Sequence, residues 1–118
     1  MGLFSRKPKL PAAFSPSTGH PGDDQLLGIF AAAEGGFTAP RDFVHYVYCD
    51  TAEGAASLES QAILEGWMVR RVSQGEGIIA NREDLPVNDT TVPAARAFFE
   101  RIAAGVDGGE YDGWEASG

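Results

Sequence analysis

The residues near the end of the chain combine large aromatic side chains with acidic ones. Tyr111 and Trp114 lie three positions apart, and Glu110, Asp112 and Glu115 surround them. Chain termini are usually small and polar, so these rings predict a terminus that packs against the fold, against a partner, or both. Aromatic side chains supply buried contact area, and carboxylates attract positively charged segments. We therefore expect these five residues to form a partner-binding surface.

The same carboxylates do not form a recognisable metal site. If Asp112-Gly113 takes the fifth and sixth positions of an EF-hand loop, Gly108 falls on the first position, which needs a carboxylate. The twelfth position then lies beyond the last residue. His20, His45 and Cys49 do not form a ligand cluster of the kind that transition metals require. The sequence therefore predicts no metal and no cofactor.

Two further motifs could indicate an enzyme. The run from Gly75 to Ala80 matches the dinucleotide pattern Gly-x-Gly-x-x-Ala, but strand-forming residues follow it and Pro86 precedes any helix. We interpret it as a hairpin turn. His45 is the only histidine expected inside the fold, and no Ser, Cys or Lys stands near it at a catalytic spacing. We expect a locally hydrogen-bonded histidine and no catalytic residue.

The charge distribution narrows the choice of partner. The first 22 residues hold three of the nine basic residues and no acid, so the rest of the chain has a net charge of −11. Such a domain repels phosphates, which argues against nucleic acid even though Tyr46 and Tyr48 could stack on bases. A basic protein surface is the expected partner. A lone cysteine, without a signal peptide or an apolar membrane span, predicts a cytoplasmic protein.

The chain divides into an arm and one domain. Residues 1–22 contain four prolines and no apolar period, which predicts a disordered basic arm before a domain over residues 23–118. Apolar spacing and capping residues predict the elements of this domain. They are a helix capped by Asp23 or Asp24, a strand over 42–49, a helix capped by Asp50 that ends at Gly66, strands over 67–72 and 78–82, a helix capped by Thr91, and a last strand through Tyr111.

This order predicts an α+β fold. A crossover after the first strand and a hairpin between the next two give a ferredoxin-like, split βαβ sandwich with an antiparallel four-stranded sheet and two main helices on one face. A short helix precedes it. The strand over 42–49 is apolar on both faces, so the face of Val44, Tyr46 and Tyr48 needs a cover. The candidates are the first helix, the C-terminal aromatics and a second copy of the chain.

The tetrapeptide Tyr111-Asp112-Gly113-Trp114, called the signature below, resembles the C-terminal signature of the RraB family. The order of helices and strands from about Asp23 to Glu115 is similar as well. The resemblance implies a small acidic bacterial protein that is not an enzyme and that inhibits the endoribonuclease RNase E, or a related ribonuclease, by binding a basic segment of it. The basic proline-rich arm and the shorter acidic stretches depart from the family pattern and leave the partner open. The alternative is a self-associating α/β domain with a structural role and no ribonuclease partner.

Overall fold

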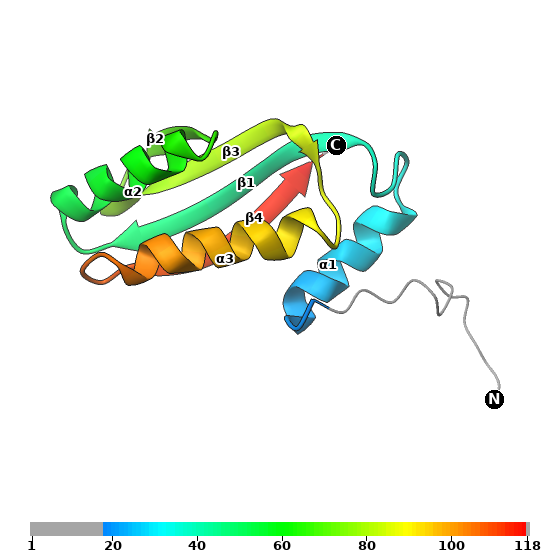
Figure 1. Ribbon diagram of the computed structural model, residues 1–118, viewed down its shortest axis with the longest axis horizontal. Coiled ribbons are helices and arrows are strands. Elements are labelled where there is room, and N and C mark those ends of the chain that lie inside the picture. The colour runs from blue at the N-terminus through cyan, green and yellow to red at the C-terminus, as the bar shows by residue number, and fades with distance from the viewer. Residues whose placement is uncertain (1–17, 118) are drawn as a thin grey trace.

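The computed structural model describes residues 18–117 of the chain. This part contains three helices and four strands, which form an α+β fold (Figure 1). The predicted class and the predicted four-stranded antiparallel sheet are confirmed. Most of the predicted arm, residues 1–17, lies outside the described residues. The elements are α1 Pro21–Ala32, β1 Pro40–Cys49, α2 Ala52–Leu64, β2 Met68–Arg71, β3 Glu76–Pro86, α3 Thr91–Ala104 and β4 Glu110–Ser117.

The sheet has the strand order β2, β3, β1, β4, and each neighbouring pair is antiparallel. β1 and β2 therefore run parallel to each other, with β3 between them and α2 as their connection. α2 and α3 lie over the same face of the sheet (Figure 1). The core fills the space between these layers, where Phe43, Val47 and Ile78 of the sheet belong to one buried cluster with Leu58 of α2 and Phe99 of α3.

The helix α1 begins earlier than predicted and has a different cap. Pro21 takes the first helical position, where a missing backbone N–H is tolerated. The Nδ1 atom of His20 accepts the backbone N–H of Asp23 at 3.1 Å, so the prediction that Asp23 or Asp24 caps the helix is wrong. Asp24 instead accepts the backbone N–H and the hydroxyl of Thr18, at 2.9 and 2.7 Å.

The predicted caps of α2 and α3 are wrong by one or a few residues. Thr51, rather than Asp50, caps α2, and its hydroxyl accepts a backbone N–H of the first turn at 2.9 Å. At the start of α3 the side chain of Asn88 accepts the N–H groups of Thr90 and Thr91 at 2.9 and 3.0 Å. In both helices the acceptor is the side chain that reaches the unpaired N–H groups of the first turn.

The hairpin strands differ in length from the prediction. β2 is shorter than predicted, while β3 continues to Pro86 and includes the residues predicted as a loop. The reason is the long partner strand: β1 already begins at Pro40, and Pro40 lies opposite Pro86 at the end of the ladder. Prolines are tolerated there because the ladder needs no further N–H group.

The outer face of the sheet, which points away from the helices, carries Val44, Tyr46 and Tyr48 of β1. The register puts Ile79 of β3 opposite Tyr46 on this face. Within residues 18–117 no helix covers it, because α1 and the ring of Trp114 both pack on the helix face. Two of the three candidate covers, the first helix and the C-terminal aromatics, are therefore wrong. Val44 is nevertheless buried within the single chain, whereas both tyrosines stay partly exposed.

A β-bulge in β4 sets the directions of the signature side chains. Gly113 lies opposite Tyr46 and Tyr111 lies opposite Val47, so Asp112 has no partner in β1. Side chains three positions apart in a regular strand point to opposite faces, but the extra residue resets the alternation. Tyr111 and Trp114 therefore both point to the helix face.

The bulge depends on the backbone of Gly113, whose φ angle is +107°. We expect Gly113→Ala to lower the free energy of unfolding by about 1–3 kcal/mol, because residues with a Cβ atom rarely adopt such a conformation. A built Cβ meets no atom within 4 Å, so the loss would report backbone strain and no clash. Denaturant unfolding followed by circular dichroism measures it.

Gly105→Ala is the matched control, since Gly105 has a φ angle of −89° and its Cβ would make only an ordinary contact with a carbonyl at 3.5 Å. We expect that variant to stay within about 0.5 kcal/mol of the natural protein. Equal stability of the two variants would contradict the role of the bulge.

Candidate functional site

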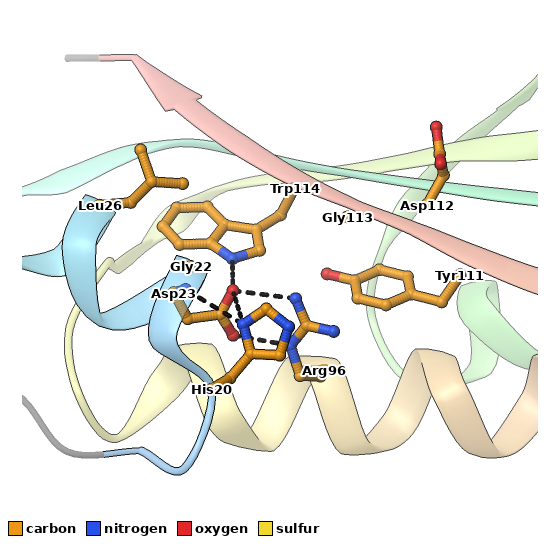
Figure 2. A pocket seen from close by; sticks show the side chains of 9 residues that line it. All are labelled: His20, Gly22, Asp23, Leu26, Arg96, Tyr111, Asp112, Gly113 and Trp114. Carbon is orange, nitrogen blue, oxygen red and sulfur yellow. Dashed lines mark hydrogen bonds and ion pairs between the residues drawn. The ribbon is translucent and has the colours of Figure 1, made fainter.

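The indole of Trp114 is held by a buried carboxylate. Its Nε1–H donates to Oδ1 of Asp23 at 2.8 Å, and Trp114 and Asp23 are only 9% and 2% exposed. The ring also meets Phe43 edge to face, with 5.5 Å between ring centroids. A buried indole N–H needs an acceptor, and the first turn of α1 provides it (Figure 2). The C-terminal strand is therefore docked onto the domain.

Asp23 is held in turn by Arg96 of α3. The guanidinium donates to both carboxylate oxygens, from Nε at 2.6 Å and from Nη2 at 2.9 Å. A two-point contact of this kind fixes direction as well as distance. Nη1 of Arg96 also donates to Glu100 at 2.9 Å, and the guanidinium carbon lies 4.9 Å from the centre of the Tyr111 ring. One carboxylate thus connects α1, α3 and β4.

These contacts shift the pKa values of both partners. Burial alone would raise the pKa of Asp23, but the hydrogen bonds from Arg96 and Trp114 and the positive charge outweigh it and hold the pKa below the ordinary value of 3.8. The hydrogen bonds with Asp23 raise the pKa of Arg96. Both groups are therefore charged at neutral pH, as a buried ion pair requires.

Tyr111 lies beside this ion pair and reaches further into the core. Its hydroxyl is 2.7 Å from Nδ1 of His45, and its ring is stacked at 6.0 Å on Phe99. Burial, assisted by the charge of Arg96, lowers the pKa of His45 to about 3, and burial raises the pKa of Tyr111. Both groups are neutral at pH 7. The expected local hydrogen bond of His45 is wrong, since its partner comes from another strand, far along the chain.

An open cleft of about 380 Å³ lies where α1, α3 and β4 meet. Figure 2 shows that Trp114, Asp23 and Arg96 converge on it, while the side chain of Asp112 points away. The polar groups at its floor already bond one another, which suits a structural joint better than a catalytic centre. Its walls are formed by His20, Gly22, Asp23, Leu26, Arg96, Tyr111, Asp112, Gly113 and Trp114.

The structure separates the five residues predicted to bind a partner into two groups. Tyr111 is half-buried and Trp114 is buried, both on the helix face. Glu110, Asp112 and Glu115 are exposed, and the register puts Glu110 and Glu115 on the outer face, opposite Tyr48 and Val44. The hydroxyl of Tyr46 donates to Glu115 at 3.2 Å. The acids therefore line the surface, and the rings fix the strand that carries them.

Sequence reasoning missed the two residues that hold the signature. The local pattern indicates Asp23 only as a helix cap, and it does not distinguish Arg96 from the other basic residues. They lie 91 and 18 positions before Trp114, so no local spacing connects them. One signal was available, because a tryptophan docked on the fold needs an acceptor for its N–H. Several carboxylates could have supplied it.

Other site classes find no support in residues 18–117. No group of three or more His, Cys, Asp and Glu side chains is arranged to hold a metal ion in this part of the chain. No helix among these residues has the length and apolarity to cross a membrane.

Comparison with known families agrees with this geometry. The model of the RraB family, described as regulator of ribonuclease activity B, matches residues 29–116. The chain belongs to the RraB family. The match includes α2, α3, the signature and all of the sheet except the last residue of β4, and it begins inside α1, so Asp23 lies before it. No curated protein sequence matches the chain.

The ion pair yields a test of stability. Asp23→Asn would remove the charge that faces Arg96 but keep an acceptor for the indole, and Asp23→Ala would remove both. We expect losses of about 1–3 kcal/mol for the first variant and more for the second, because a buried charge loses its partner. Asp24→Asn is the control, since the side chain of Asp24 accepts from Thr18 and takes no part in the contact with Arg96 and Trp114. A loss in the control as large as in Asp23→Asn would contradict the assignment.

The lowered pKa of Asp23 gives this contribution a pH dependence. A carboxyl whose folded pKa is below its unfolded value stabilises the fold above the unfolded value, near 3.8, and the effect disappears as the pH falls through the folded pKa. We expect the difference in unfolding free energy between the natural protein and Asp23→Asn to be constant from pH 5 to 7 and to shrink below about pH 4. Urea titrations at several pH values would measure it, and a pH-independent difference would contradict it.

Proposed function

We propose that this RraB member is a non-catalytic regulator that binds and inhibits a ribonuclease, RNase E or a related enzyme, through a basic segment of that enzyme. The observation that carries the proposal is the row of exposed carboxylates on β4, formed by Glu110, Asp112 and Glu115. Membership in a family described as regulators of ribonuclease activity supports the class of partner.

The row of carboxylates is long enough to contact a short basic segment. Glu110 and Glu115 lie opposite Tyr48 and Val44, which are four positions apart in β1. At a rise of about 3.4 Å per residue they are therefore roughly 14 Å apart along the strand. Each carboxylate is exposed, so it can meet a cation without losing an internal partner that the fold needs. Attraction by such surface charges acts mainly on the rate of association and is screened over about 10 Å at 0.1 M salt.

The aromatic side chains of the signature would act indirectly. Tyr111 and Trp114 hold β4 against α1 and α3, and this keeps the row of acids in place. Direct aromatic contacts with the partner would come from the outer face, where Tyr46 already bonds Glu115 and Tyr48 lies opposite Glu110. Aromatic side chains beside charges are frequent contributors to protein interfaces.

We also propose a ferredoxin-like classification and action in the cytoplasm. The strand order, with β1 and β3 central and the parallel β1 and β2 joined by α2, supports the first. The unpaired Cys49 supports a reducing compartment.

Charge reversal tests the acidic surface. In a cleavage assay of a single-stranded RNA by purified RNase E, we expect the combined variant E110K/D112K/E115K to need at least about tenfold more protein for half inhibition, equivalent to about 1.4 kcal/mol. The matched control is E53K/E83K/D89K, which makes the same change in net charge at exposed positions elsewhere. Equal loss in both variants would show that only net charge matters.

The salt dependence of binding is a second test of the acidic surface. We expect the association rate of the natural protein with RNase E to fall as salt rises from 0.05 to 0.5 M, with a smaller change in the dissociation rate. Binding that is indifferent to salt and to charge reversal would rule out the acidic surface. Direct binding of RNA by the chain would contradict the proposed function as a whole.

The second candidate is a self-associating domain, favoured by the partly exposed side chains of Tyr46, Tyr48 and Ile79 on the outer face. It predicts a dimer in sedimentation analysis that dissociates in Tyr48→Ser, together with no effect on RNA cleavage. A monomer that inhibits the ribonuclease would exclude it.

A further inference from the structure

The strand β4 is an edge of the sheet. It pairs with β1 on one side, and among the described residues no strand pairs with it on the other. The backbone N–H and C=O groups along such an edge can pair with another extended chain. The other edge, β2, has four residues, two of which are Arg70 and Arg71, whereas β4 has eight residues and contains no proline, lysine or arginine. β4 therefore offers the longer run of backbone groups for pairing, while its bulge and its carboxylates restrict which strand can pair with it.

The bulge places the aromatic and the acidic side chains of β4 on opposite faces of the sheet. Because it resets the alternation between Tyr111 and Trp114, both rings point to the helix face, and the acids at 110, 112 and 115 are left on the other side. The close view agrees, since Asp112 points away from the ring of Tyr111 (Figure 2). One face of the edge is thus aromatic and occupied, and the other is acidic and open.

We propose that a basic segment of the regulated ribonuclease adds to β4 as a fifth strand of the sheet. This inference rests on the proposed function and specifies how the partner is recognised. Side chains directly opposite each other on neighbouring strands interact most strongly, and opposite charges stabilise the pair. An added strand would point every second side chain to the outer face. The partner segment should therefore carry Lys or Arg at alternate positions over about six residues, and main-chain hydrogen bonds should supply affinity.

The charges favour this occupant over a second copy of the chain. Two β4 strands side by side would bring their rows of carboxylates together, and like charges on adjacent strands repel. Pairing of β4 with β2 of another copy would use only the four residues of β2, and Arg71 already bonds Glu59 at 3.1 Å. Such head-to-tail pairing would also produce a ring or an open chain of copies and no two-fold dimer.

The test uses the full chain and synthetic peptides, without the ribonuclease. The first peptide alternates Lys with Thr or Val over eight residues. The second has the same composition with all Lys residues in one block, and the third is the alternating peptide with methylated backbone nitrogens, which keeps the charge but removes the N–H donors. We expect the alternating peptide to bind at least about tenfold more tightly than either of the others. Hydrogen exchange should show new protection confined to amides of β4.

Several outcomes would overturn the inference. Equal affinity of the methylated peptide would mean that charge alone attracts the segment. New protection at Tyr46, Tyr48 and Ile79 without protection in β4 would place the peptide on the outer face. If the chain alone has twice the mass of a monomer and this dimer does not bind the peptide, a second copy of the chain is the occupant of the β4 edge. E110K/D112K/E115K, checked for folding by circular dichroism, should lose the preference for the alternating peptide, and an unchanged preference would also contradict the inference.

The outcome separates this inference from the proposed function. If the alternating peptide adds to β4 but the chain does not inhibit the ribonuclease, the proposed partner is wrong and the edge recognition stands. If inhibition depends on the acids but hydrogen exchange in the complex shows no protection of β4, the proposed function is supported and the addition of a fifth strand is contradicted.

Discussion

The shared carboxylate of Asp23 is the interaction on which the arrangement of the C-terminal strand depends. It accepts hydrogen bonds from the indole N–H of Trp114 and from Nε and Nη2 of Arg96. Three elements that are distant in sequence, α1, α3 and β4, therefore meet at one side chain. A buried ion pair contributes little to stability by itself, because desolvation offsets the attraction, but loss of one member leaves an uncompensated charge. The pair therefore acts as a geometric constraint: it fixes where α1 and β4 lie relative to α3.

The second constraint is the one extra residue in β4. Without the bulge, Tyr111 and Trp114 would point to opposite faces. One of the two rings would then lie on the outer face and would be missing from the core. With it, the signature has two faces of different chemistry: the rings complete the core and the acids face solvent. The tetrapeptide thus combines two large residues with a residue that can adopt a positive φ angle, which accounts for its composition in physical terms.

Much of the fold was accessible from the sequence, because apolar periodicity and glycine positions are local signals. Most of β1, the glycine at position 66 that follows the C-cap of α2, and the four-stranded sheet followed from them. The caps were less predictable, since His20, Thr51 and Asn88 compete with equally suitable neighbours and only three-dimensional proximity decides. The candidate site could be predicted from the sequence only in part. The residue types at 110–115 indicated both docking and acidity, but the separation of rings from acids depends on a bulge, and the Asp23–Arg96 pair joins residues 73 positions apart.

The position of Asp23 has a consequence for where this domain begins. The family match starts at Ile29, in the middle of α1. A shortened protein that started at this position would lack the fully buried Leu27 as well as the carboxylate, and it would leave an indole N–H and a guanidinium without their partners. The contacts that hold β4 in place therefore extend beyond the matched residues, back to the cap of α1 at His20. The first turn of α1 and position 96 form one structural unit in this chain, because each supplies the buried partner of the other.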